Sequence, residues 1–205
     1  MVNHPSSKKV SLEALKAGLK SILDEVKVDE KWRFFLNGVR YVFVPQSMMM
    51  LVFEEILNVL GATVKTMLWP FIDISGYTVA NQLMDRGAPP EKVIEAYADF
   101  NDPRGWGLTE AVKTDLEKPE VVVRMHNSYF ASWLRENVKD LTAKFPFYEC
   151  PWGPNWIGAV RAAIERSGRQ PPKLVYKEVK CLALGDDYCE WYIGCLLYTS
   201  PSPRD

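Results

Sequence analysis

Apolar residues return every three or four positions in several stretches of the chain, which is the spacing of an amphipathic helix. In the first such stretch, residues 11–26, Ser11 stands where a helix N-cap is expected. Met48, Met49 and Met50 open another stretch, and we interpret them as core-filling residues rather than as ligand contacts. The pattern, with its glycine and proline breaks, predicts helices over 11–26, 47–60, 70–86, 91–100, 130–144 and 156–167.

Runs of β-branched and aromatic residues predict strands over 40–44, 121–127, 174–183 and 188–193. Residues 184–187, with the sequence LGDD, join the last two runs as a hairpin turn would. Residues 101–107, rich in proline and glycine, indicate a tight loop. Helices outnumber strands, and the strands lie in neighbouring pairs. We therefore expect an α+β fold in which an antiparallel sheet packs with several helices.

Composition narrows the classes of function. The chain has 205 residues, of which 47% are hydrophobic and 25% charged, as in ordinary globular domains. Its 25 basic and 26 acidic residues give a formal net charge of −1, which does not favour nucleic-acid binding. The longest apolar stretch, 48–60, contains Glu54 and Glu55, so no membrane span is expected. Without an apolar leader pattern, we expect a cytoplasmic protein whose cysteines stay reduced.

The last residues, 195–205, read CLLYTSPSPRD and resemble the translation of a sequencing adapter. A genuine Ser/Pro-rich tail is the alternative. We expect the native domain to reach Gly194 and leave open a missing output domain beyond it.

Cys150, Cys181 and Cys189 carry the clearest candidate chemistry. Cys181 and Cys189 flank the predicted hairpin turn, where directly opposed strand residues lie about 4.5–5.5 Å apart. Cys150 lies in a loop ahead of the helix predicted over 156–167, and Glu178 lies shortly before Cys181. Three thiolates and one carboxylate would make a closed, structural site suited to zinc. Three buried, unliganded thiols are the alternative, because free cysteine often packs as a small apolar residue.

The position of Glu178 raises a geometric difficulty. Residues three apart in a regular strand face opposite sides, so Glu178 and Cys181 can share an ion only if the strand bulges or the long glutamate side chain reaches around. Glu149 and His126 are the competing candidates for the fourth ligand.

An ordered set of short motifs resembles the 4-vinyl reductase domain family. Residues 177–191, KEVKCLALGDDYCEW, are similar to the closing motif of that family, with its acidic residue, two cysteines and an aromatic residue. Three upstream pieces follow the family order, namely GWG at 105–107, VRMHNS at 123–128 and CPWG at 150–153. The resemblance spans residues 39–193. It implies a domain over 39–194, preceded by an N-terminal helical extension over 1–38.

The family is similar to the N-terminal aromatic-sensing domains of phenol- and xylene-responsive transcription activators. It shares its fold with vesicle-tethering subunits and is related to haem-based nitric oxide sensors. In the aromatic sensors three cysteines and a glutamate hold zinc, and these match Cys150, Glu178, Cys181 and Cys189. The resemblance also implies an enclosed ligand pocket and a homodimer. The phenol-contacting histidine and tryptophan of those sensors have no match in this sequence, so the ligand itself is not predicted.

Three functions are therefore considered. The first is a sensor or regulatory domain that binds a small apolar or aromatic molecule. The second, implied by the family name, is an auxiliary protein or reductase acting on a vinyl tetrapyrrole in bacteriochlorophyll-type metabolism. We favour it less, because no dinucleotide motif is present and hydride chemistry needs a cofactor. The third is a protein-interaction module. Candidate residues for the pocket of a sensor are Phe71, Tyr77, Trp106, His126, Tyr129 and Trp133.

Overall fold

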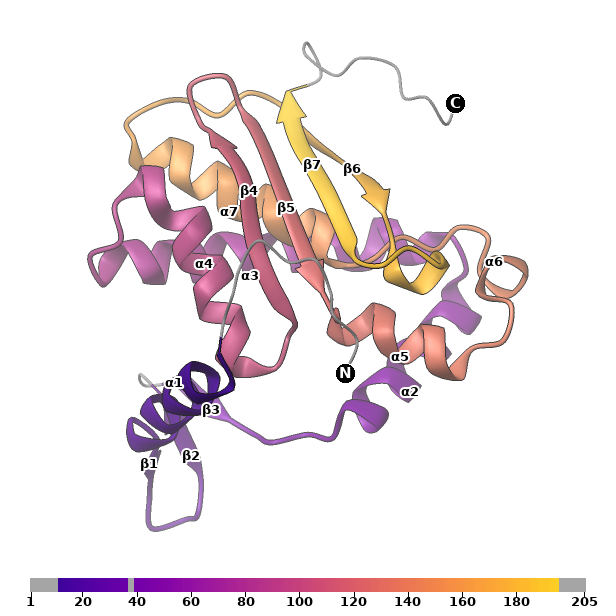
Figure 1. Ribbon diagram of the computed structural model, residues 1–205, viewed down its shortest axis with the longest axis horizontal. Coiled ribbons are helices and arrows are strands. Elements are labelled where there is room, and N and C mark those ends of the chain that lie inside the picture. The colour runs from indigo at the N-terminus through magenta and orange to yellow at the C-terminus, as the bar shows by residue number, and fades with distance from the viewer. Residues whose placement is uncertain (1–10, 37–38, 196–205) are drawn as a thin grey trace.

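The computed structural model describes residues 11–36 and 39–195 and has the predicted α+β architecture (Figure 1). The adapter-like residues 196–205 and the first ten residues lie outside the described part of the chain. None of the described helices combines the length and the apolarity that a bilayer crossing requires.

A four-stranded antiparallel sheet forms one side of the domain, in the order β4-β5-β7-β6. Its strands are β4 (Leu108–Asp115), β5 (Glu120–His126), β6 (Leu174–Lys180) and β7 (Cys189–Cys195). Alternate side chains of β5 and β7 face the core and are fully buried, among them Val123, Met125, Trp191 and Ile193. The sequence did not predict β4, since LTEAVKTD is mostly polar. It becomes a strand by pairing with β5 along its whole length.

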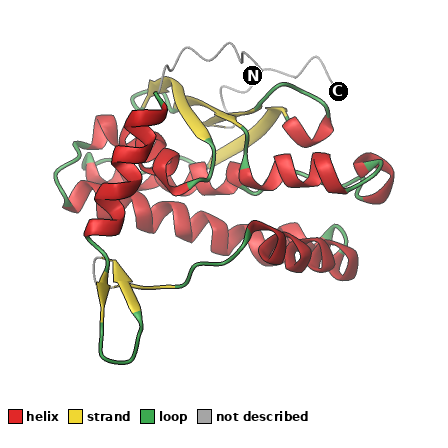
Figure 2. Cartoon of the chain, turned by 60° about the horizontal axis from the view of Figure 1, so that its bottom comes forward, coloured by secondary structure: helices red, strands yellow, loops and turns green. Residues whose placement is uncertain are grey.

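Helices cover the core-facing side of this sheet (Figure 2). The central one is α7 (Trp152–Arg166), which packs against α3 (Thr63–Asp85) and against β6 and β7. Most residues of α7 are buried. The remaining helices are α1 (Leu12–Asp24), α2 (Gln46–Leu60), α4 (Val93–Asn101), α5 (Tyr129–Asn137) and α6 (Leu141–Lys144), with 3₁₀ turns at Pro90–Lys92, Asp102–Arg104 and Leu182–Leu184.

A smaller antiparallel sheet projects with α1 from one end of the domain (Figure 1). It comprises β1 (Lys27–Val28), β2 (Phe34–Leu36) and β3 (Val39–Tyr41). The expected start of the main domain at residue 39 falls between the paired strands β2 and β3. The expected end at Gly194 lies within β7, because Cys195 still pairs with Leu174 and is buried.

Several helix boundaries differ from the prediction. Helix α3 begins at Thr63 and contains Pro70 in its interior, although proline was expected in its first turn. The predicted helix over 130–144 is two helices, because Val138 is extended and Asp140 is left-handed, with its carboxylate capping α6. Helix α7 starts at Trp152 rather than at residue 156, since Pro154 is tolerated in the first turn, where its missing N–H is not needed.

The interpretation of the three consecutive methionines holds for one of them. Met50 is fully buried in the core, whereas Met48 and Met49 are 60% and 48% exposed. Helix α2 turns only one face to the domain, so neighbouring positions on it point in different directions.

Two glycines allow α3 and α7 to approach each other closely. A Cβ atom on Gly76 would lie 1.8 Å from the backbone oxygen of Asn155, and one on Gly158 would lie 1.9 Å from that of Asp73. No side chain fits at either position unless the helix backbones move apart. Around this contact, Arg161 forms an ion pair with Asp73 at 3.0 Å.

We expect Gly158→Ala to lower the free energy of unfolding by about 1–3 kcal/mol, because the added methyl group must displace backbone atoms of α3. This loss outweighs the gain of about 0.5–1 kcal/mol that replacing glycine in a helix otherwise brings. Urea unfolding followed by circular dichroism measures the change. Ser75→Ala, at an exposed position of α3, is the control and should stay within about 0.5 kcal/mol of the parent protein. Equal stability of the two variants would contradict the close helix contact.

Candidate metal centre

The loop before α7 and the two strands of the β6–β7 hairpin bring potential metal ligands together. Cys150 lies directly before α7, Glu178 lies in β6, and Cys189 begins β7. One ligand atom from each of these residues lies within 4.8 Å of the other two. The two thiols are fully buried, and the three residues form a group that could hold a metal ion.

Cys181 lies beside this group. It follows β6, caps the 3₁₀ turn Leu182–Leu184 and is 2% exposed. Its thiol interacts with that of Cys189. The pairing of β6 with β7 shifts register between Glu178 and Lys180, so the strand is irregular at the point where the geometric difficulty was expected. Cys181 is nevertheless not one of the three residues whose ligand atoms lie within 4.8 Å of one another.

Hydrogen bonds hold the donor groups in place. The N–H of Cys150 donates to Glu178 Oε2 at 3.0 Å, and the N–H of Leu182 donates to Cys189 Sγ at 3.3 Å. The N–H of Cys181 donates to the Asp186 carboxylate at 2.8 Å, which fixes the turn. Such outer contacts orient metal ligands before an ion binds.

The electrostatics of the group also suit a cation. Glu178 Oε1 is buried and has no hydrogen-bond partner among the described residues. Burial raises the pKa of Glu178 to about 7. The neighbouring thiols of Cys150 and Cys181, together with burial, raise the pKa of Cys189 well above its ordinary value. An ion would supply the positive charge that lets these crowded acidic groups ionise together.

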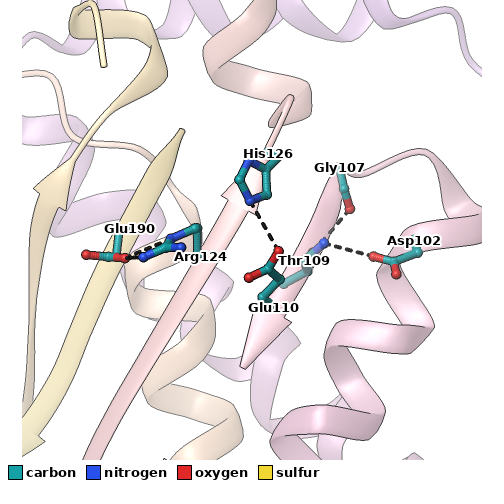
Figure 3. A network of polar contacts seen from close by, with 7 residues as sticks. All are labelled: Asp102, Gly107, Thr109, Glu110, Arg124, His126 and Glu190. Carbon is teal, nitrogen blue, oxygen red and sulfur yellow. Dashed lines mark hydrogen bonds and ion pairs between the residues drawn. The ribbon is translucent and has the colours of Figure 1, made fainter. Parts of the chain in front are cut away.

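The competing fourth ligands have other partners. Glu149 accepts hydrogen bonds from Lys65 Nζ at 2.5 Å and from the Tyr176 hydroxyl at 2.7 Å. His126, at the end of β5, places its Nε2 3.4 Å from Glu110 Oε1 on β4 (Figure 3). Neither belongs to the group of three.

Figure 3 shows further polar contacts near His126, on the sheet and beside it. Arg124 binds the Glu190 carboxylate of β7 through Nε and Nη2, at 2.9 and 2.7 Å. The Asp102 carboxylate accepts the N–H of Thr109 at 2.9 Å and so ties the start of β4 to the end of α4. His126 itself thus has a polar partner, Glu110, on the neighbouring strand.

The structure brings together only some of the residues expected to line a ligand pocket. Trp106 and Tyr129 pack with ring centroids 5.1 Å apart, and the N–H of Tyr129 donates to the Trp106 carbonyl. Trp133 on α5 is half-buried against the core. Phe71 and Tyr77 lie elsewhere, on α3. The Phe71 side chain is 70% exposed, and the Tyr77 hydroxyl donates to Glu165.

A buried aromatic cluster was missed by the sequence analysis. Trp106 packs on Trp152, which stacks on Trp156 with centroids 6.3 Å apart, and Tyr97 of α4 lies 4.9 Å from Trp156. The indole Nε1 atoms of Trp152 and Trp156 are buried without a hydrogen-bond partner among the described residues, as is Nδ2 of Asn101. The i, i+4 spacing of the two tryptophans after Pro151 was the available signal, but aromatic residues at helical spacing usually indicate only a core.

A cleft of about 320 Å³ lies beside this cluster and is lined by residues from several elements, including Gln46, Asn127, Tyr129 and Ser132. The side-chain amide of Gln46 at the start of α2 donates to the Tyr129 carbonyl at 2.7 Å and spans this region. A second cleft of about 320 Å³ lies next to Glu178 and Cys181.

Comparison of the sequence with protein-family models and with curated proteins finds no match. The fold, however, resembles a crystal structure of the phenol-responsive sensory domain of the transcription activator PoxR with phenol. The TM-score is 0.65 at 15% sequence identity, covering 93% of this chain and 94% of that one. Subunit 3 of a trafficking protein particle complex from Naegleria fowleri, covalently bound to palmitic acid, aligns with a TM-score of 0.48 and 13% identity, over 76% of this chain and 98% of that one. The chain therefore shares its fold with the PoxR domain.

We expect the purified protein to take up one divalent ion per chain, and Cys189→Ser to abolish this uptake, because the variant removes a central thiolate. Native mass spectrometry gives the stoichiometry and identifies the ion, and Co²⁺ gives a thiolate charge-transfer absorption band. Cys195→Ser, a change of another buried cysteine of β7, is the matched control and should bind as the parent does. Uptake that is lost in both variants, or in neither, would contradict this site.

Proposed function

We propose that this domain is a sensor of a small apolar or aromatic molecule. The observation that carries the proposal is the buried aromatic cluster around Trp152 and Trp156, which contains unpaired N–H groups among aromatic rings. Small-molecule sites usually combine such an apolar lining with a few polar groups that orient the ligand. The likeness of the fold to a sensory domain supports the proposal.

We place the ligand against Trp106, Tyr129 and the two α7 tryptophans. His126 and Trp133 belong to the adjoining strand and helix, and we propose them as contacts of a larger ligand. Phe71 and Tyr77 are not part of this pocket in our proposal, because both lie on α3, one exposed and the other bound to Glu165.

We further propose that the metal group is a structural zinc site with Cys150, Glu178, Cys181 and Cys189 as its ligands. Three thiolates and one carboxylate suit zinc, and four protein ligands leave no open position for catalysis. The bound ion would fasten the start of α7 to the β6–β7 hairpin. A native mass spectrum that shows a different metal would contradict zinc.

The motifs that resemble the 4-vinyl reductase domain family support our placing the chain in that family. Residues 105–107 lead into β4 with positive φ angles at Gly105 and Gly107, and residues 150–153 open α7. Residues 123–128 and 177–191 form parts of β5 and of the β6–β7 hairpin. Each motif thus contributes to the aromatic cluster, to the metal group or to the strands between them. No observation favours the reductase alternative over the sensor.

We propose a homodimer through the exposed apolar side of α2 and α3. This surface includes Met48, Leu51, Val52, Val59, Met67, Phe71 and Ile74, each at least half exposed. Extended apolar surfaces of this kind mark protein interfaces. A monomeric mass for the purified protein in light scattering would contradict the dimer.

Binding of small aromatic probes tests the sensor. We expect at least one of toluene, phenol and acetophenone to bind in a calorimetric titration, and Trp156→Leu to weaken that binding at least tenfold, because Trp156 lies at the centre of the cluster. Trp32→Leu is the matched control, since Trp32 is 84% exposed and outside the cluster. Circular dichroism checks that both variants are folded. If none of the probes binds, or if the two variants bind alike, the proposed pocket is wrong.

A further inference from the structure

The cleft beside the metal group borders only part of that group. Glu178 and Cys181 line this cleft of about 320 Å³. Cys150 and Cys189 are not among its lining residues, and their side chains are completely buried. The cleft is much larger than the roughly 30 Å³ that one water molecule occupies in the liquid, so a small reagent has room in it. Cys181 is therefore the thiol of the group that a molecule in this cleft meets first.

Two polar groups that line the same cleft have no hydrogen-bond partner among the described residues. They are the hydroxyl of Tyr148, a side chain that is 7% exposed, and Oε1 of Glu178. The Tyr148 hydroxyl lies close enough to Cys150 and Cys181 to interact with them electrostatically. Buried polar groups are nearly always paired, so a small polar molecule in the cleft would pair with this hydroxyl beside the Cys181 thiol.

Cys181 and Cys189 are placed to form a disulfide bond. The pairing of β6 with β7 sets Lys180 opposite Glu190, so Cys181 and Cys189 take the next opposed positions. The backbone of Cys181 is still extended, with φ −137° and ψ 119°. Opposed residues of antiparallel strands have Cα atoms about 4.5–5.5 Å apart, within the range of about 4.4–6.8 Å that disulfides span. The two thiols already interact with each other.

Hydrogen bonds of the hairpin turn hold both cysteines in this arrangement. The N–H of Cys181 donates to the Asp186 carboxylate at 2.8 Å, and the N–H of Asp186 donates to the Cys181 carbonyl at 3.2 Å. The N–H of Leu182 donates to Cys189 Sγ at 3.3 Å, which keeps this sulfur next to the segment that begins with Cys181. Cys150 instead comes from the loop before α7. Cys189 is therefore the better placed partner for Cys181.

We propose that Cys181 is a thiol-oxidation site, which a small hydroperoxide reaches through the cleft, and that Cys189 is the second thiol of the reaction. The Cys181 sulfur attacks one peroxide oxygen, the O–O bond breaks, and the other oxygen leaves with the thiol proton as water or an alcohol. Cys181 is then a sulfenic acid. The Cys189 sulfur attacks the Cys181 sulfur, the S–O bond breaks, and the hydroxyl group leaves with the Cys189 proton as water. Two thiols are oxidised to one disulfide, and the peroxide is reduced.

The same reaction would release the ion of the proposed zinc site. The electron pairs with which Cys181 and Cys189 hold the ion become the S–S bond, and solvent supplies the two protons. The ion keeps only Cys150 and Glu178, which are too few ligands for a closed tetrahedral site. Peroxide would thus unfasten the start of α7 from the β6–β7 hairpin. This role goes beyond the sensing of an apolar molecule and requires no ligand in the aromatic cluster.

Thiol labelling tests access through the cleft. We expect N-ethylmaleimide, added briefly to protein that a chelator has freed of metal, to modify Cys181 at least tenfold faster than Cys150 or Cys189. Peptide mass spectrometry gives the three rates, and circular dichroism checks that the metal-free protein is folded. Faster labelling of Cys150 or Cys189 would overturn the assignment of Cys181 as the accessible thiol.

Treatment of the metal-free protein with hydrogen peroxide tests the disulfide. Trypsin leaves Cys181, Cys189 and Cys195 in one peptide, residues 181–204, and a second cut before Asp186 separates Cys181 from the other two. We expect a bond from Cys181 to Cys189 that dithiothreitol reverses. In Cys189→Ser, Cys181 should remain a sulfenic acid that dimedone traps. Cys195→Ser is the matched control and should form the same disulfide as the parent.

The outcomes separate this proposal from the others. A bond from Cys181 to Cys150, or no disulfide in folded protein, would overturn it. In metal-loaded protein we expect the ion to appear, in a chromophoric chelator assay, as fast as the disulfide forms. Retention of the ion by fully oxidised protein would overturn the link between oxidation and the metal group. None of these results decides the sensor proposal, which the aromatic probes test separately.

Discussion

The close contact between α3 and α7 is the constraint on which the rest of the domain depends. Because Gly76 and Gly158 carry no side chain, the backbones of the two helices meet, and α7 is held between α3 and the strands β6 and β7. This position buries most of α7, which thereby contacts both the helical layer and the sheet. The two tryptophans of the aromatic cluster lie in the first turns of this helix, directly after Cys150. A change in the distance between α3 and α7 would therefore shift residues of both the aromatic cluster and the metal group.

The metal group depends on the same helix from its other side. Cys150 approaches from the loop before α7, while Glu178 and Cys189 come from adjacent strands, so the group joins the helical layer to the sheet. Its donors are preorganised by backbone hydrogen bonds such as the one from Cys150 N–H to Glu178. Buried acidic groups at such distances repel each other when ionised, and a bound cation would turn this repulsion into attraction. The group is thus suited to holding a cation between the start of α7 and the β6–β7 hairpin.

The aromatic cluster and the metal group are neighbours along the chain, since Cys150 and Trp152 are two residues apart. The first region is rich in unpaired N–H donors, and the second is rich in acidic groups. Both regions adjoin the start of α7.

The sequence by itself determined the elements whose signals are local. Ser11 accepts the N–H of Ala14 and caps α1 as predicted, and the Gly-Asp turn after Cys181 joins two paired strands. The cysteines and the glutamate of the metal group could also be predicted from their spacing and from the family resemblance, because few residue types bind metal ions. Tertiary structure decided the features that depend on distant partners. The polar segment 108–115 is a strand only because β5 pairs with it, and Pro70 lies inside a helix that packing against α7 extends. Contacts between helices decide which aromatic residues surround the unpaired indole N–H groups. The irregular pairing of β6 with β7 affects where the Glu178 side chain lies relative to the thiols. Neither feature leaves a local pattern in the sequence.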